Sequence, residues 1–334
     1  MPELRVGLLG GGSWGTTVAS LVTRNAPVTL WARNPATVAE INDKHTNETY
    51  LPGIELPEKL VATNDIAAAV STADVVVMGI PSQNFRSVLE EVAKHIRAWV
   101  PVISLTKGLE VESRKRMTEI IEEVLPGHPT GVLTGPNLAR EIMEGKAAAS
   151  VLAMQGGGNV ELVRPLFNSG LFRVYTNEDV SGCELGGVLK NIIAIAVGMG
   201  DGMGAGDNTR AALITRGLAE VTRLGVALGG QSETFAGLAG MGDMIATCTS
   251  DQSRNRHVGF QLGQGQTIDE IVGGMVMVAE GVKTAPAVIE LAQSHSIEMP
   301  IAEEVYRIII GESNASRALR GLLRIMAGAE SDPG

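Results

Sequence analysis

The sequence is poor in the residues that bind structural metals or form disulfides. Among its 334 residues there are only two cysteines, Cys183 and Cys248, and they belong neither to a CxxC pair nor to a Cys/His cluster with zinc spacing. We therefore expect no metal site. Such sparing use of cysteine is typical of a protein in a reducing compartment.

Basic charge and long apolar runs are also scarce. The chain has 27 Lys and Arg against 37 Asp and Glu, a formal net charge of −10, which disfavours nucleic acid or an anionic membrane as the main partner. Its most apolar later segments, residues 192–200 and 271–279, are too short to span a bilayer. The first residues enter an apolar strand pattern without the basic stretch of a secretory signal. We expect a cytoplasmic protein with no membrane insertion and no bound nucleic acid.

The first half of the chain alternates short apolar runs with amphipathic stretches. This alternation predicts a doubly wound α/β fold, with a mostly parallel sheet covered on both faces. Near residue 178 the strand pattern stops and helical periodicity takes over, so we expect an α/β domain at 1–178 and an all-helical domain at 179–334. The predicted strands are 4–10, 28–31, 74–80, 101–105, 131–134, 148–154 and 172–175, and the predicted helices of the first half are 13–24, 35–44 and 82–97.

A glycine-rich loop follows the first predicted strand and opens the first predicted helix. Residues 10–15, GGGSWG, satisfy GxGxxG, and in this context the pattern indicates a dinucleotide site of the Rossmann type. Gly10 allows a tight turn, Gly12 lets the pyrophosphate approach the backbone, and Gly15 permits close helix packing. The helix N-terminus offers N–H groups to the anion. The indole of Trp14 is expected to lie against the cofactor or to pack between the domains.

Two basic residues directly follow predicted strands. The first of them, Arg33, indicates the kind of nucleotide. The second predicted strand ends in Leu30-Trp31-Ala32-Arg33-Asn34, with no acid to hold the ribose hydroxyls of NAD. Arg33 suits a 2′-phosphate, so the sequence favours NADP(H), with NAD(H) possible and a solvated surface arginine as the alternative. Lys107 follows the strand at 101–105, where it faces either a ligand or solvent.

A single cation interrupts an apolar helical stretch in the second half. Lys190 lies within residues 186–202, where burial would lower its pKa and enable proton exchange, unless its methylene stem carries the ammonium to the surface. Asp243 follows a glycine turn and could hold that ammonium. Ser253-Arg254-Asn255-Arg256 groups a hydroxyl, two guanidiniums and an amide, a combination suited to a phosphate.

Taken together, the motifs resemble those of the bacterial NAD(P)-dependent sn-glycerol-3-phosphate dehydrogenases. The likeness covers roughly residues 4–310, and its motifs occur in order at family-like spacing. They are GxGSWGT at 10–16, TKG at 106–108, GPN-LA at 135–139, LKN at 189–191, GxGD at 240–243, SRN at 253–255 and EGxxTA at 280–285.

The resemblance implies reversible reduction of dihydroxyacetone phosphate to sn-glycerol 3-phosphate, the precursor of glycerophospholipids. Lys190 would be the proton donor and acceptor. The cofactor contacts would be Ser13, Trp14, Arg33, Lys107, Ala139, Arg254, Val278 and Glu280. The substrate contacts would be Lys107, Gly135, Asn137, Lys190, Asp243, Ser253, Arg254 and Asn255. Asn137 departs from the Ser or Thr usual in the family. The apolar helical half favours a homodimer.

Two other functions fit parts of the pattern. A β-hydroxyacid or ketopantoate-type dehydrogenase would use the same scaffold, but its carboxylate substrate needs no separate phosphate-binding group such as residues 253–255. A non-catalytic regulator that binds NADPH would have no use for a proton-transfer pair such as Lys190 and Asp243.

Overall fold

The computed structural model describes residues 4–155, 160–275 and 279–322. The chain divides into two compact units, the first formed by Met1–Glu110 and Lys115–Val180 and the second by Val111–Arg114 and Ser181–Gly334. The prediction put the boundary after residue 178, and no sequence pattern indicated that Val111–Arg114 groups with the second unit.

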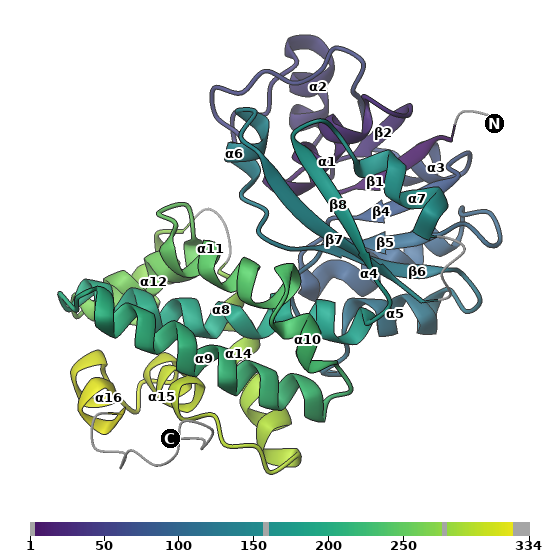
Figure 1. The fold of residues 1–334 in the computed structure, drawn as a ribbon. Helices are drawn as coiled ribbons and strands as arrows, with labels where there is room; N and C mark the ends of the chain where they lie inside the picture. The colour runs from purple at the N-terminus through teal and green to yellow at the C-terminus, as the bar shows by residue number, and fades with distance from the viewer. Residues whose placement is uncertain (1–3, 156–159, 276–278, 323–334) are drawn as a thin grey trace. The chain divides into compact units, whose positions relative to one another are not determined.

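The first unit contains an eight-stranded sheet with the strand order β3-β2-β1-β4-β5-β6-β7-β8 (Figure 1). All neighbouring strands run parallel except β6 and β7, which are antiparallel. The strands are β1 (Val6–Leu9), β2 (Val28–Trp31), β3 (Val61–Thr63), β4 (Val75–Met78), β5 (Val102–Ser104), β6 (Thr130–Thr134), β7 (Ala148–Met154) and β8 (Phe172–Asn177).

Helices cover both faces of this sheet, and a separate apolar core lies on each face. One core takes side chains from α1, α2, α6 and α7, and the other from α3, α4 and α5. Strands between two such layers are apolar on both faces, which is why β1 and β4 are continuous apolar runs. The helices are α1 (Ser13–Val22), α2 (Pro35–Lys44), α3 (Ile66–Val70), α4 (Ser82–Ala93), α5 (Met117–Val124), α6 (Ala139–Met143) and α7 (Val160–Phe167).

The described elements of the chain after β8 are all helical, so the predicted change from α/β to helical structure is confirmed. They are α8 (Val180–Gly202), α9 (Asp207–Ala227), α10 (Ser232–Phe235), the π-helical turn η1 (Leu238–Gly242), α11 (Asp243–Thr249), α12 (Arg254–Gly263), α13 (Ile268–Gly273), α14 (Glu280–Ser294), α15 (Pro300–Ile309) and α16 (Ala315–Leu322).

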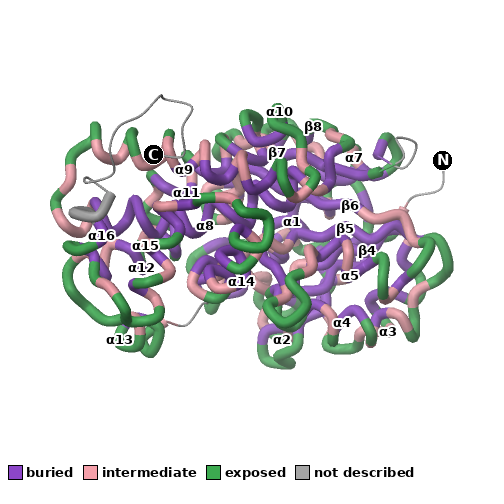
Figure 2. The backbone as a smooth tube through the Cα atoms, turned by 90° about the horizontal axis from the view of Figure 1, so that it is seen from below, coloured by how far each residue is buried: buried purple, intermediate pink, exposed green. Residues whose placement is uncertain are grey.

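Helix α8 is the central helix of the second unit. Residues 182–200 are buried without interruption, and Figure 2 shows α8 in a buried stretch of the chain. By length and mean hydropathy α8 could cross a membrane, but 94% of its most apolar window is buried inside the protein. An apolar helix that is buried on all sides is the expected core of a helical domain.

Candidate active site

The glycine loop joins β1 to α1 in the geometry that a dinucleotide site requires. Gly10 has φ +122°, and a Cβ there would lie 2.3 Å from the carbonyl oxygen of Gly79, so only glycine fits. A Cβ on Gly15 would lie 2.0 Å from the carbonyl oxygen of Gly10, which shows how closely α1 approaches the loop. Gly12 is different, because a Cβ there meets nothing within 4 Å. There is therefore open space next to the Cα atom of Gly12. This space lies at the start of α1, whose first residue is Ser13.

Trp14 belongs to the packing of the first unit. Its ring lies 6.3 Å from that of Phe172 in β8, at an interplanar angle of 58°, and the side chain packs against the core that contains α1. The indole Nε1 is buried and has no hydrogen-bond partner among the described residues. The cofactor contact predicted for Trp14 stays a prediction.

The side chain of Asn47 holds the glycine loop in place, and the sequence analysis did not identify this residue. Its side chain is fully buried, and its Nδ2 donates to the carbonyl oxygen of Gly11 at 2.9 Å and to Oγ1 of Thr16 at 3.0 Å. Both acceptors lie at the junction of loop and helix. No spacing rule marks an isolated asparagine in a loop, so only the structure reveals this support.

Arg33 and Ala139 lie at the starts of two helices of the first unit. Arg33 is exposed in the turn after β2, next to Asn34, whose side chain caps α2. Ala139 is the first residue of α6 and packs against the apolar core. The residues directly after β2, Ala32, Arg33 and Asn34, include no acid, so this end of the sheet offers a guanidinium rather than a carboxylate.

Lys107, Gly135 and Asn137 come together beyond the ends of β5 and β6. The Nζ of Lys107 donates to the carbonyl oxygen of Gly135 at 2.8 Å, and Gly135 has φ +135°. Oγ of Ser150 donates its only proton to the carbonyl oxygen of Thr134 at 2.7 Å, so Ser150 accepts from Nδ2 of Asn137 at 3.2 Å. These bonds fix the orientation of the Asn137 amide. Its Oδ1 is buried and unpartnered among the described residues, and it can only accept a hydrogen bond.

In the second unit Lys190 is buried, which excludes the alternative that it reaches the surface. Its side chain is 5% exposed, and its Nζ lies 3.2 Å from Oδ1 of Asp243, whose side chain is 3% exposed. Nζ also donates to Oγ1 of Thr247 at 2.5 Å, while that hydroxyl donates to the carbonyl oxygen of Asp243 at 2.6 Å. The ammonium is therefore held by a carboxylate and a hydroxyl that belong to the same turn of α11.

A glycine contact explains why the carboxylate reaches the lysine. A Cβ on Gly186 would lie 2.6 Å from the carbonyl oxygen of Ala239, so α8 touches η1 directly at this point. Lys190 lies four residues after Gly186, on the same face of α8, and Asp243 lies four residues after Ala239. The same contact thus places the two charged side chains opposite one another.

Thr247 was missed by the sequence analysis, although one signal could have found it. A residue four positions after Asp243 in a helix shares its face. The neighbouring Cys248 does not compete for the proton, because burial raises the pKa of its thiol to about 12, even though the positive charge of Lys190 acts in the opposite direction.

The SRN segment at the start of α12 has more than one role. Oγ of Ser253 accepts from the backbone N–H of Arg256 at 3.2 Å and so caps the helix, while the side chain of Arg254, the first residue of α12, is exposed. Nδ2 of Asn255 donates to Oδ1 of Asn191 at 3.0 Å, and its Oδ1 accepts from the N–H of Gly281 at 3.0 Å. Asn255 therefore ties α12 to the helix of Lys190 and to the start of α14. The substrate contact predicted for Asn255 stays a prediction.

One expectation about this segment was wrong. Arg256 was grouped with Arg254 as part of a phosphate-binding cluster, but its guanidinium is committed to Asp201 and Asp251. An arginine already paired with two carboxylates has little positive charge left for an anion.

Two predicted cofactor residues, Val278 and Glu280, are close together in the sequence, but the structure describes only the second of them. Glu280 begins α14, whereas Val278 lies outside the described residues. Among the residues that the structure does describe, no group of three or more His, Cys, Asp or Glu side chains could hold a metal ion.

Models of a known protein family match both units. The model for the NAD-dependent glycerol-3-phosphate dehydrogenase N-terminus matches residues 5–158, and the model for the C-terminus of the same family matches residues 179–320. These two ranges leave out only the residues around the boundary of the units and the chain ends.

Similar proteins and a similar crystal structure agree with the family models. The glycerol-3-phosphate dehydrogenase (NAD(P)+) 2 of Sphingopyxis alaskensis is 68% identical over 332 residues, which cover 99% of this chain and 100% of that protein. The glycerol-3-phosphate dehydrogenase (NAD(P)+) 1 of Mycobacterium tuberculosis is 55% identical over 329 residues, covering 98% and 96%. The crystal structure of a glycerol-3-phosphate dehydrogenase from Coxiella burnetii is 37% identical with a TM-score of 0.92, covering 96% and 99%.

Proposed function

Because the chain belongs to the family of NAD-dependent glycerol-3-phosphate dehydrogenases, we propose that it reduces dihydroxyacetone phosphate reversibly to sn-glycerol 3-phosphate, with Lys190 as the proton donor and acceptor. The observation that carries this proposal is the buried pair of Lys190 and Asp243, whose charged atoms are 3.2 Å apart. A buried ammonium needs a partner and is costly to maintain, so its position inside the helical unit points to chemistry rather than to stability.

The proposed proton transfer follows from the contacts of the lysine. Asp243 and Thr247 hold Nζ in place through a carboxylate 3.2 Å away and a hydroxyl 2.5 Å away. In the reduction direction Lys190 stabilises the alkoxide and then gives it a proton. In the oxidation direction the neutral amine accepts the hydroxyl proton, and Asp243 stabilises the ammonium that forms.

We assign the substrate contacts of the first unit to Lys107, Gly135 and Asn137. Lys107 supplies a positive charge beside the Gly135 carbonyl, and Asn137 supplies the buried acceptor Oδ1. Ser150 fixes this amide, so we propose that Asn137 accepts a hydrogen bond from a substrate hydroxyl. A serine or threonine hydroxyl could also donate at that point, whereas Oδ1 of Asn137 can only accept.

We assign the phosphate of the substrate to Ser253, Arg254 and Asn255 in the second unit. The exposed guanidinium of Arg254, together with the backbone N–H groups that begin α12, presents several donors to an anion. A substrate with a phosphate group has a use for these donors, whereas the hydroxyacid of a related reductase has none.

The glycine loop fits a dinucleotide, because the space above Gly12 is open and the turn at Gly10 excludes any side chain. When bound, the nicotinamide supplies the hydride that reduces the carbonyl carbon of the substrate. We propose NADP(H) as the favoured cofactor because Arg33, rather than an acid, follows β2, with NAD(H) possible. The cofactor would also contact Ser13, Trp14, Lys107, Ala139, Arg254, Val278 and Glu280.

The physiological setting is proposed on the same basis. The product is the backbone of glycerophospholipids, so the enzyme would supply lipid synthesis in the cytoplasm. The apolar composition of the helical unit favours a homodimer.

The test is the oxidation of NADPH with dihydroxyacetone phosphate, run beside NADH and beside unphosphorylated dihydroxyacetone. We expect turnover with the phosphorylated substrate and a kcat/KM lower by several orders of magnitude without the phosphate, since remote binding energy is lost. Absence of turnover with dihydroxyacetone phosphate and either cofactor would overturn the proposal.

A further inference from the structure

Helices α8 and α12 meet along a seam of glycines. Each of four glycines would place a Cβ between 2.0 and 2.4 Å from a carbonyl oxygen of the other helix: Gly198 from Arg256, Gly202 from Phe260, Gly259 from Ile195 and Gly263 from Met199. The glycines are spaced four residues apart on both helices, so the two backbones are in direct contact over a full turn. This seam joins the helix of Lys190 to the helix of Arg254.

A glycine seam brings helices close but does little to fix how they slide or rotate. Side chains that interdigitate set the register of ordinary helix pairs, and glycines have none. Polar contacts beside the seam must therefore hold α12 at one position along α8, and the bond from Nδ2 of Asn255 to Oδ1 of Asn191 is one of them.

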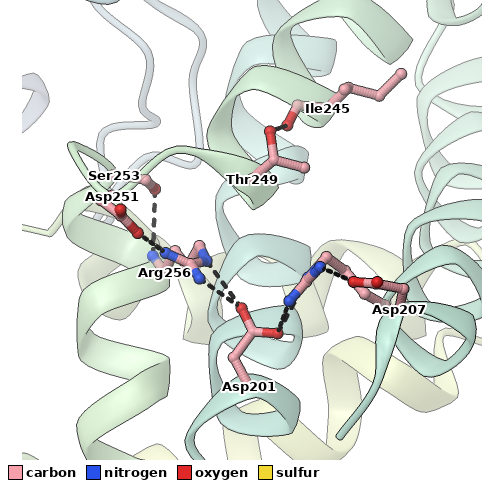
Figure 3. Close-up of polar contacts among 8 residues, drawn as sticks. Asp201, Asp207, Ile245, Thr249, Asp251, Ser253 and Arg256 are labelled. Atoms are coloured by element: carbon pink, nitrogen blue, oxygen red, sulfur yellow. Dashed lines mark hydrogen bonds and ion pairs between the residues drawn. The ribbon is translucent and has the colours of Figure 1, made fainter.

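Asp201 provides a second and charged contact at the end of α8, as Figure 3 shows. Its carboxylate is 6% exposed, and its Oδ2 accepts from Nε of Arg256 at 2.9 Å and from Nη2 at 2.8 Å. Its Oδ1 accepts in the same way from Nε of Arg210 at 3.1 Å and from Nη2 at 2.9 Å. Each guanidinium thus donates two hydrogen bonds to one carboxylate oxygen of Asp201. Two donors fix the orientation of the arginine side chain as well as its distance from the carboxylate.

The place of Arg256 in α12 is not explained by the stability of that helix. Arg256 lies in the first turn, where a positive charge is unfavourable next to the N-terminal end of the helix dipole. Its own backbone N–H donates to the Ser253 cap, so the anchored side chain and the cap share one residue. The pair with Asp201 is therefore fixed directly to the turn that carries Ser253, Arg254 and Asn255.

We propose that Asp201 and Arg256 are positioning residues for phosphate recognition. Their salt bridge holds the register of α12 on the glycine seam and so sets the distance from Lys190 to the donors of residues 253–255. This inference rests on the proposed function, in which those residues bind the substrate phosphate.

The test compares a phosphorylated and an unphosphorylated substrate in the variant Arg256→Lys. Lysine keeps the charge but replaces two directed donors with one flexible ammonium, so α12 loses the charged contact that fixes its register and keeps only the Asn255–Asn191 bond. We expect kcat/KM for dihydroxyacetone phosphate to fall about 10- to 100-fold, mainly through KM, because a displacement of about 1 Å is enough for such a loss. The kcat/KM for dihydroxyacetone should stay within about threefold of the wild type, since this substrate has no phosphate to misplace.

Arg210→Lys is the matched control. Arg210 grips the same carboxylate from α9, which carries none of the proposed phosphate ligands. Its variant should lower Tm to a similar extent as Arg256→Lys and leave the ratio of the two kcat/KM values unchanged. Gly198→Ala displaces α12 by a different route, because the new methyl group pushes α12 away from α8. Like Arg256→Lys, it should lower the kcat/KM for dihydroxyacetone phosphate relative to that for dihydroxyacetone.

The outcomes separate the inference from the proposed function. If the wild type fails to reduce dihydroxyacetone phosphate, the proposed function falls. If the wild type is active and Arg256→Lys changes Tm but not the ratio, the salt bridge is only structural and the inference is overturned. The same holds if Arg210→Lys lowers the ratio equally, because the effect then passes through α8 and not through α12. Should Gly198→Ala fail to fold, Arg256→Lys alone decides.

Discussion

The glycine loop of the first unit and the lysine centre of the second are built by opposite means. The loop is a backbone structure formed by consecutive residues, in which side chains are mostly excluded. The lysine centre consists of buried polar side chains, and Lys190 and Thr247 are 57 residues apart in the chain. A site of the first kind is sensitive to added volume, whereas a site of the second kind is sensitive to lost or unpaired charge.

The largest effect is expected from Lys190→Ala, which removes the central charge of the lysine centre. We predict a fall in kcat of about 10²- to 10⁴-fold, the usual contribution of a positioned general acid. NADPH should bind as tightly as before, because the glycine loop lies in the other unit and its backbone is unchanged. Steady-state rates and a fluorescence titration with NADPH measure the two effects. A variant that keeps near-normal rates would refute the role proposed for Lys190.

A second buried charge of the helical unit should make stability depend on pH. Glu220 in α9 is 1% exposed and accepts from the N–H groups of Ile301 and Ala302 at the start of α15. Burial raises the pKa of Glu220 to about 7. The two backbone N–H groups and the charge of Arg223 oppose this rise, and the charge of Glu303 adds to it.

Because the pKa of Glu220 is higher in the folded state than its ordinary 4.5, its contribution to stability is complete below pH 4.5 and is lost as the pH rises through about 7. The loss amounts to about 3 kcal/mol in the free energy of unfolding. Glu220→Gln should remove this part of the pH dependence, as urea unfolding from pH 5 to pH 8 would reveal. The exposed Glu312→Gln should keep the wild-type slope. An identical slope in Glu220→Gln would exclude Glu220 as its source.

The same contrast explains how much the sequence could predict. The loop at residues 10–15 was located because every determinant is local, and the helix 35–44 and the strands at 28–31 and 148–154 were predicted with the bounds that the structure has. The three-residue strand β3 and the short helices α3 and α6 were not predicted because such segments are too short to show a period. The eight-residue helices α5 and α7 were not predicted either. The charged pairing of Arg256 with Asp201 was not foreseen, since nothing in the sequence relates residues 55 positions apart.

Two substitutions in the glycine loop are expected to have smaller effects. They distinguish the part of the loop that is needed for packing from the part that is needed for cofactor binding. In Gly15→Ala the new Cβ lies 2.0 Å from the carbonyl oxygen of Gly10, so we expect a loss of about 1–3 kcal/mol in stability. In Gly12→Ala the Cβ meets nothing within 4 Å and φ is −75°, so stability should change by less than about 1 kcal/mol. The methyl group nevertheless fills the space proposed for the pyrophosphate.

For Gly12→Ala we therefore expect the Kd of NADPH to rise about tenfold, equivalent to about 1.4 kcal/mol. Thermal unfolding and NADPH titration of both variants measure the two quantities. If Gly12→Ala bound NADPH normally, the open space above Gly12 would not be the pyrophosphate site.

The effect that salt weakens most is expected from Arg33→Ala, where the first unit does rely on a charge. Arg33 is exposed, so its contact with a 2′-phosphate would be partly screened by water and salt. We predict that the preference for NADPH over NADH, as a ratio of kcat/KM values, falls about tenfold at low salt and less at high salt. The rate with NADH should hardly change, because NADH has no phosphate for the guanidinium to bind. A ratio that stays the same at both salt concentrations would remove the basis for favouring NADP(H), since among the residues at the end of β2 only Arg33 argues for it.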